Sequence, residues 1–248
     1  MILGLLLALL CLLPSPLHAA WAEVGTCPGG AGCQRNSIAT GATVDSQNLS
    51  FPNNGTSGNA IVALGVAYDS GGAPASVSVT STCSAALSVY SSSTVSLKRE
   101  FIAFGPRTSG GACTVTVNPA GSNAFVSFAI NEYSGGGTLD VDNAAGSSGS
   151  STAMSVNITT TVPGALILGV ASTSSSTTVD PAAGYTEIGE EEDNSTHQDF
   201  NALFAIAGAA GLYTVAWDTG FLPGWSAHVL SLAPTATTSV ARRRIINP

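Results

Sequence analysis

Gly111-Ala-Cys-Thr-Val-Thr-Val-Asn118 alternates apolar and polar side chains, and a second stretch, Gly211-Leu-Tyr-Thr-Val-Ala-Trp-Asp218, keeps the same alternation. Successive side chains of a β-strand point to opposite faces of a sheet, so a period of two predicts strands with one buried face. Antiparallel sheets commonly pack one face on a core and leave the other face in water. The two stretches therefore predict an antiparallel all-β fold.

Short apolar runs bounded by Gly, Pro or Asn predict further strands, because runs of this length suit buried strands rather than independent helices. The Ala-rich segment 201–210 is interrupted by Gly208, and its alignment with 101–107 predicts a strand there as well. The apolar runs are Ala60–Tyr68, Phe101–Phe104, Ala124–Tyr133, Ala165–Ala171 and Ala227–Leu232.

The same pattern occurs twice along the chain. Residues 111–118 align with 211–218, Phe125–Ile130 falls on Trp225–Leu230 at the same spacing, and Leu64-Gly-Val-Ala67 matches Leu168-Gly-Val-Ala171. Collinear matches at nearly constant spacing indicate a duplication. We therefore expect an antiparallel, jelly-roll-like β-sandwich with internal pseudo-twofold symmetry, in which Val115 lies over Val215 and Phe125 over Trp225.

The duplicated region spans residues 41–234, with halves of about 41–140 and 141–234. Two arrangements satisfy the pattern: two tandem sandwiches, or one larger sandwich in which the halves interlock. Each half has few large apolar residues for a core of its own, so the single domain is favoured.

The first twenty-two residues have the pattern of a signal peptide. Ile2–Leu13 is apolar but shorter than a membrane-spanning helix, and Ala20-Trp21-Ala22 supplies small residues for a signal peptidase. Cleavage is expected after Ala22, with cleavage after Ala19 as the alternative. No later segment reaches spanning length, so the sequence predicts a secreted or cell-surface protein, with a flexible tail at 235–248 that includes Arg242–Arg244.

Four cysteines remain after the signal peptide, an even number that predicts two disulfides in an oxidising compartment. Of the three connectivities we favour Cys27–Cys33, which closes a loop within the N-terminal segment 23–40, together with Cys83–Cys113. The cysteines lack the C-x2-C spacing of zinc sites and have no histidine nearby, which argues against a metal site built from them.

Composition disfavours two classes of function. The 248 residues carry a formal charge of −8 with only 9% charged residues, which argues against binding to nucleic acid. The predicted mature chain has two histidines, His197 and His228, and no Gly-x-Ser-x-Gly motif, so a hydrolase triad is not expected even though Ser226 lies near His228. Alignment of His228 with Phe128 predicts a packed ring, and the protein is predicted not to be an enzyme.

Two groups of residues are candidate sites. In the first, Asp218, Phe221 and Trp225 lie in or beside an aromatic loop that could stack on sugar rings, although both tryptophans also fit the core or its rim. In the second, Asp140 and Asp142 direct two carboxylates to one side of an extended segment, as a calcium site would require, although a turn at the end of a strand explains them too.

An acidic segment offers a further carboxylate cluster. It consists of Glu190–Asp193 with Glu187 and Asp199 nearby, and it is predicted to be a solvated loop between strands that limits aggregation. A pair of glycosidase carboxylates could also be drawn from Glu132, Asp140 and Asp142, but that chemistry depends on a separation that the sequence does not define.

Five short motifs at predicted strand ends and turns point to a group of proteins. They are Glu132-Tyr-Ser-Gly135, Leu139-Asp140, Pro163-Gly-Ala-Leu-Ile-Leu-Gly169, Ala183-Gly-Tyr-Thr-Glu187 and Trp225-Ser-Ala-His-Val-Leu-Ser-Leu232. On these motifs the chain resembles uncharacterised bacterial secreted β-sandwich proteins of unknown function over roughly residues 55–233, and the resemblance implies a fold and no catalytic residues. The Cys27/Cys33 segment and the second cysteine pair depart from the resemblance.

The sequence thus predicts an extracellular, non-enzymatic module that binds a glycan or another surface polymer. A structural or adhesive protein that self-assembles is the first alternative, because the surface is low in charge and rich in Ser, Thr and Gly. A polysaccharide-active enzyme is the second alternative and rests on fold analogy alone.

Overall fold

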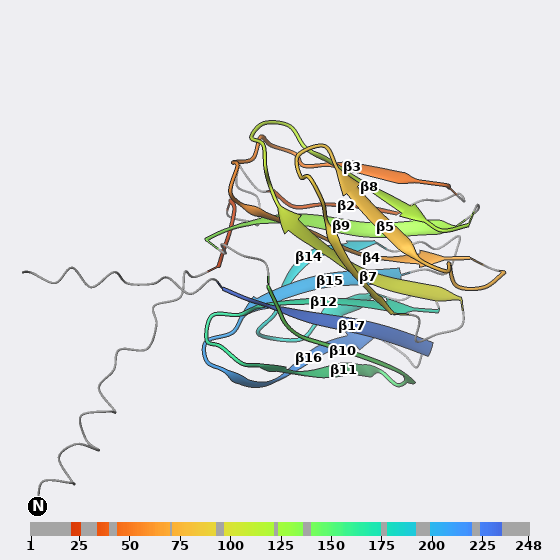
Figure 1. Cartoon of the computed structure of the whole chain (residues 1–248). Coiled ribbons are helices and arrows are strands. Elements are labelled where there is room, and N and C mark those ends of the chain that lie inside the picture. Colours follow the sequence, from red (N-terminus) through yellow and green to blue (C-terminus); the bar gives the residue numbers. More distant parts are fainter. Residues whose placement is uncertain are drawn as a thin grey trace, which may run out of the picture.

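The computed structural model describes residues 21–25, 34–39, 44–69, 71–92, 97–121, 124–135, 140–174, 178–191, 199–219 and 224–234. The described residues form β-strands and connecting segments and contain no helix, which confirms the all-β prediction (Figure 1). The strands up to residue 134 are β1 Ala22–Glu23, β2 Asn36–Ala39, β3 Gln47–Ser50, β4 Ala60–Tyr68, β5 Val77–Ser81, β6 Ser88–Ser92, β7 Lys98–Pro106, β8 Thr114–Pro119 and β9 Phe125–Ser134. The later strands are β10 Asp140–Ser150, β11 Ala153–Thr160, β12 Leu166–Thr173, β13 Val179–Pro181, β14 Thr186–Glu191, β15 Asp199–Ile206, β16 Gly211–Thr219 and β17 Gly224–Ala233.

The strands form two large and two small antiparallel sheets. The first half contributes a large sheet in the order β1-β9-β4-β7-β6, with β2 also paired to β9, and a small sheet β3-β8-β5. The second half contributes a large sheet β10-β17-β12-β15-β14 and a small sheet β11-β16-β13. Among the described strands, none of one half pairs with a strand of the other, so the halves meet through side chains.

Strand order is the same in the two halves. Adding eight to each label of β2-β9-β4-β7-β6 gives β10-β17-β12-β15-β14, and the same step converts β3-β8-β5 into β11-β16-β13. Residues 199–206 form strand β15 rather than a helix, as expected, and Val115 and Val215 are both fully buried in the central strands of the small sheets.

Three apolar cores alternate with the four sheets. One core lies within each half, between its large and small sheets, and a third fills the space between the two large sheets. This third core, called the seam here, takes side chains from both halves, among them Leu64 and Ile102 from the first and Leu168 and Phe204 from the second. In Figure 1 the large sheets occupy the middle of the stack and the small sheets its two extremes.

The repeated Leu-Gly-Val-Ala motif forms the middle of β4 and β12, which are central strands of the large sheets. A Cβ on Gly65 would lie 2.4 Å from Phe128 Cβ, and one on Gly169 would lie 2.9 Å from both Leu203 and Trp217. Both glycines therefore leave room for large side chains in the core of their own half. The same close approach of core side chains therefore explains the glycine at both positions.

Strand register corrects the predicted alignment of β9 with β17. Gly65 lies opposite Phe128, and Gly169 lies opposite Val229, so β17 is offset from β9 by one residue more than the sequence match implies. A shift of one residue exchanges the two faces of a strand. The prediction that Phe125 lies over Trp225 is therefore wrong in register: Phe125 corresponds to Ser226.

The same shift corrects the prediction for His228, which corresponds to Ser127 rather than to Phe128. His228 is nevertheless buried, as expected, with 7% of its surface exposed. Its side chain faces the seam, because Leu230 and Leu232, at alternate positions of the same strand, point into that core. Phe128 instead faces the core of the first half.

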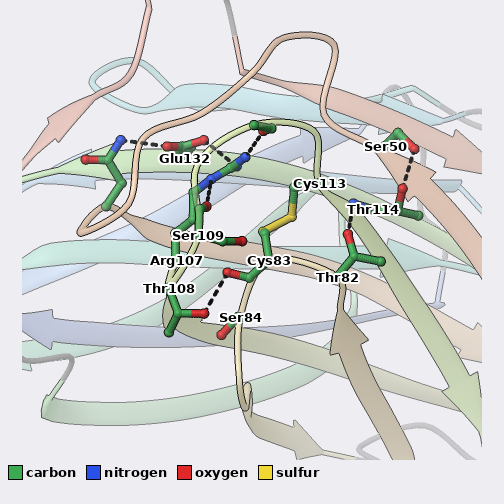
Figure 2. The surroundings of a disulfide bond; sticks show 12 residues. Ser50, Thr82, Cys83, Ser84, Arg107, Thr108, Ser109, Cys113, Thr114 and Glu132 are labelled. Carbon is green, nitrogen blue, oxygen red and sulfur yellow. Dashed lines mark hydrogen bonds and ion pairs between the residues drawn. A yellow bond between two sulfur atoms is a disulfide. The ribbon is translucent and has the colours of Figure 1, made fainter.

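The predicted Cys83–Cys113 disulfide is present, with the two Cα atoms 5.3 Å apart. The two cysteines extend the neighbouring strands β5 and β8 by one or two residues, and both are 1% exposed (Figure 2). The predicted partners Cys27 and Cys33 lie outside the described residues.

The predicted cleavage sites fall at the edge of the described region. Residues 1–20 lie outside it, whereas Trp21 is buried in the seam and Ala22–Glu23 pairs with β9 as strand β1. No helix among the described residues is long and apolar enough to cross a membrane.

Candidate functional site

The outer faces of the two small sheets present hydroxyl and amide groups to solvent. Strand β11 alternates strictly between exposed and buried residues, and β5 and β8 bury every second side chain. Their inward residues are Val, Ile and Met, which pack on the core, so the outward positions are left to short polar side chains. Each half therefore carries a polar sheet face on the side away from the seam.

The first outer face consists of Asn48, Ser50, Ser78, Thr80, Thr114 and Thr116. Cross-strand hydrogen bonds hold these side chains in place: Thr116 Oγ1 donates to Asn48 Oδ1 at 2.7 Å, and the hydroxyls of Ser50 and Thr114 are 2.8 Å apart. None of the six side chains carries a charge, so this face offers hydrogen-bond donors and acceptors without favouring an anionic or a cationic ligand.

The second outer face consists of Ser155, Asn157, Thr159, Leu212, Thr214 and Asp218. It repeats the polar pair of the first face, because Thr214 Oγ1 donates to Asn157 Oδ1 at 2.8 Å. It differs in Leu212, which is 68% exposed, and in the neighbouring Tyr185, whose hydroxyl donates to the Thr214 carbonyl. This face combines polar groups with a small apolar surface.

The predicted ligand-binding residues do not form one exposed group. Trp225 is only 6% exposed and packs in the core of the second half, where its Nε1 donates to Ser151 Oγ at 3.1 Å. Asp218 is exposed on β16, opposite Ala153 and Asp180. Phe221 lies outside the described residues. Trp225 thus lies in the core, which was the alternative position that the sequence allowed, whereas Asp218 lies on the second outer face.

The predicted calcium residues lie at the start of β10. Asp140 pairs with Ala233, and a β-bulge falls at Asp142, between Val141 and Asn143. The side chains of both aspartates lie outside the description, so the calcium site stays a prediction. Within the part of the chain that the structure describes, no three His, Cys, Asp or Glu side chains gather as a metal site would require.

The acidic segment begins in a strand rather than in a loop, which corrects the prediction for its first residues. Glu187, Glu190 and Glu191 belong to β14 and accept hydrogen bonds from Asn201 Nδ2, Val179 N and Ser37 Oγ, respectively. Residues 192–198 lie outside the description. These three glutamates therefore tie an edge strand to its neighbours.

A buried polar cluster in the seam was missed by sequence reasoning. Glu100 of β7 is fully buried, and its Oε1 accepts hydrogen bonds from Ser172 Oγ at 2.8 Å and from Ser226 Oγ. The two serines come from β12 and β17 of the other half, with their oxygens 3.2 Å apart. One carboxylate thus joins the two halves through two hydroxyls, and the signal for it was a charged residue at a core-facing position of an apolar strand.

Lys98 lies next to this cluster on the same face of β7. It is 3% exposed and its Nζ donates to the Thr173 carbonyl of the second half. Burial lowers the pKa of Lys98 from 10.5 to about 8, against the opposing effect of the Glu100 and Asp199 carboxylates. The Lys98 ammonium bonds to the Thr173 carbonyl and the Glu100 carboxylate bonds to the two serines, so both groups join the halves at a position closed to solvent.

The cluster does not have the arrangement of a hydrolase triad. Such a triad requires the histidine to accept the proton of the serine, with the carboxylate bonded to the histidine. Here both serines donate directly to Glu100, and neither ring nitrogen of His228 has a hydrogen-bond partner among the described residues. Ser226 and His228 are therefore packed side by side without a catalytic contact.

His228 should make stability depend on pH below neutrality. Burial lowers its pKa below the ordinary 6.5, so the unfolded chain binds a proton over a range in which the folded chain does not. Stability is then retained above pH 6.5 and lost as the pH falls below it. We expect His228→Leu to reduce the difference between the free energies of unfolding at pH 7 and at pH 5, both measured by urea denaturation. An unchanged difference would contradict the assignment.

Glu132, once a candidate carboxylate for catalysis, is held in a buried structural contact. Its Oε2 accepts from Arg107 at 2.9 Å, its Oε1 accepts from Asn59 at 2.6 Å, and both charged side chains are fully buried (Figure 2). Arg107 also donates to the carbonyls of Ser109 and Gly111. Every oxygen of the carboxylate is occupied, so Glu132 connects β7, β9 and the segment before β4.

Comparisons with known proteins give no guide to function: no family model matches this chain, and no curated protein and no solved structure matches it at a significant level.

Proposed function

We propose that this protein is an extracellular, non-enzymatic module that binds a neutral, hydroxyl-rich surface polymer, such as a glycan, along its outer faces. The observation that carries the proposal is the pair of outer faces, each with an Asn–Thr hydrogen bond between strands at the surface. Hydroxyl and amide groups suit the donors and acceptors of a polyol chain. The buried state of the seam cluster supports a role without catalysis.

We also propose that each half is a jelly-roll-like sandwich and that the two halves arose by duplication. Counted from β2 in the first half and from β10 in the second, the first strand pairs with the eighth, the eighth with the third and the third with the sixth, while the second pairs with the seventh in the opposing sheet. This nested pairing is typical of an antiparallel ribbon wound into two sheets. The repeated strand order and the glycines at positions 65 and 169 support the duplication.

Secretion is part of the same proposal. It is supported by the predicted signal peptide and by the Cys83–Cys113 disulfide, because disulfides persist mainly in oxidising compartments.

Arginine substitutions on the outer faces test the proposed binding surface. Thr116→Arg and Thr214→Arg each place a long charged side chain at the centre of one face, where exposed substitutions have small effects on folding. We expect wild type to show saturable retention by at least one neutral polysaccharide in a panel. Each single variant should lose about half of the bound polymer per molecule, and the double variant nearly all of it.

Thr186→Arg is the matched control, because Thr186 is an exposed threonine on β14 of a large sheet. It should bind as wild type does. The outer-face variants should melt within a few degrees of wild type, because each loses one cross-strand hydrogen bond at the surface. Binding that survives in the double variant would place the ligand elsewhere. If wild type forms larger particles in sedimentation without any added polymer, the self-assembling alternative is favoured. If wild type releases reducing sugar from a polysaccharide, an enzyme is favoured.

A further inference from the structure

The N-terminal residues of the described chain close the seam between the two halves. Trp21 is 2% exposed and belongs to the core that both large sheets share, which also contains Tyr133 of the first half and Phe204 of the second. Those two rings also contact each other edge to face, with centroids 5.2 Å apart. A tryptophan in this position adds a large buried surface to the core that the two halves share.

Strand β1 fixes the position of Trp21. Ala22 and Glu23 pair with Ser134 and Tyr133, and Val24 N donates to the Glu132 carbonyl at 2.9 Å. The pairing continues the edge of the first large sheet, so the backbone on both sides of Ala22 is part of the folded structure. Cleavage after Ala22 would leave only Glu23 of these two paired residues on the mature chain.

An ion pair holds the residues that follow. The Glu23 carboxylate accepts two hydrogen bonds from Arg35, one of them at 2.6 Å from Nη2, and a third from Asn131. Arg35 in turn donates to the Glu187 carbonyl and lies 5.3 Å from the centre of the Phe204 ring. Glu187 and Phe204 belong to the second half, so this N-terminal segment binds both halves at once.

We infer that export processing cuts the chain before Trp21, after Ala19, so that Trp21 remains on the mature protein as part of the seam. The inference rests on the predicted signal peptide, and it selects between the two cleavage positions that the sequence allows. Cleavage after Ala22 would remove Trp21 and half of β1, which would leave a gap in the shared core. With cleavage after Ala19, the residues Trp21–Glu23 belong to the mature fold rather than to the leader.

The first test is the N-terminus of the exported protein. The full chain is expressed with its own leader in a bacterial host, and the protein from the periplasm or medium is sequenced from its N-terminus and weighed intact. A first residue of Ala20 is expected. A first residue of Glu23, or retention of Met1, would overturn the inference.

The second test measures the role of Trp21 directly. Two chains that begin at Ala20 and at Glu23, and are otherwise identical, are compared by thermal melting. Loss of a buried tryptophan from a shared core should lower the melting temperature by about 10 °C. Trp21→Ala in the longer chain should match the Glu23 chain, whereas Trp21→Phe should retain most of the difference. Equal melting temperatures for the two chains would show that Trp21 has no structural role and would overturn the inference.

The outcome is separable from that of the proposed polymer binding. The outer faces lie in the small sheets, away from the seam, so an error about the ligand leaves the cleavage position and the melting temperatures unaffected.

Discussion

Arg107→Ala is expected to lower the free energy of unfolding by about 3–5 kcal/mol, the range found when one partner of a buried ion pair is removed. Both side chains of the Arg107–Glu132 pair have no exposed surface. The substitution leaves the Glu132 carboxylate with Asn59 and Thr56 as hydrogen-bond partners and no positive charge beside it. It also removes the donors that bind the carbonyls of Ser109 and Gly111, and urea denaturation measures the total loss.

A double-mutant cycle separates the charge from the packing. Arg107→Met keeps most of the apolar stem, and Glu132→Gln keeps an oxygen for Asn59 while it removes the negative charge. If the uncompensated carboxylate is the main cost, the Arg107→Met/Glu132→Gln double variant should be at least about 1 kcal/mol more stable than the sum of the two single effects predicts. Strict additivity would mean that the pair contributes packing and little else.

Space around this ion pair is also limited. A Cβ on Gly55 would lie 2.3 Å from Glu132 Oε2 and 2.4 Å from the Arg107 guanidinium carbon. Residue 55 must therefore be glycine if the pair is to close, which gives a physical reason for a glycine in the segment before β4.

The strands that sequence patterns predicted best are those with one face in water. In β8, β11 and β16 the inward residues are apolar and the outward residues mostly polar, so a period of two is visible in the sequence. The central strands β4 and β12 are instead buried on both faces, between a core of their own half and the seam. Their apolar runs predicted strands correctly but could not predict which side chain faces which core.

The misplaced register of β9 and β17 has the same cause. Both strands are buried along nearly their whole length, so they lack the alternation of polar and apolar residues that would fix the register. Phe125 was therefore matched with Trp225 by residue type alone. The pairing of Gly65 with Phe128 and of Gly169 with Val229 supplied the missing information.

The seam cluster could be predicted only in part. Lys98 and Glu100 are charged residues at alternate positions of an otherwise apolar strand, which is a sign of a buried polar contact. Their partners could not be named, because Ser172 and Ser226 are common residue types and lie 72 and 126 positions from Glu100. The packing of one half on the other determines that contact.

Removal of the Cys83–Cys113 disulfide is the second change with a large expected effect. The bond closes a loop of 30 residues, for which the chain-entropy relation gives about 3.5 kcal/mol of stabilisation through restriction of the unfolded chain. The Cys83→Ala/Cys113→Ala double variant should therefore unfold at a clearly lower urea concentration than wild type. The native backbone nearby should persist, because the Cys83 carbonyl accepts from Thr108 N and the Cys113 carbonyl from Phe51 N without the bond.

Reductant provides the control for this second prediction. Added dithiothreitol should destabilise wild type by at least as much as the double substitution does, and it should act on the double variant only through the predicted Cys27–Cys33 pair. A loss of unfolding free energy below about 1 kcal/mol in the double variant would contradict a main role for the bond.

Arg107 contacts the same segment between β7 and β8, so combining its replacement with loss of the disulfide should cost less than the two separate effects added together, since each constrains residues 107–113.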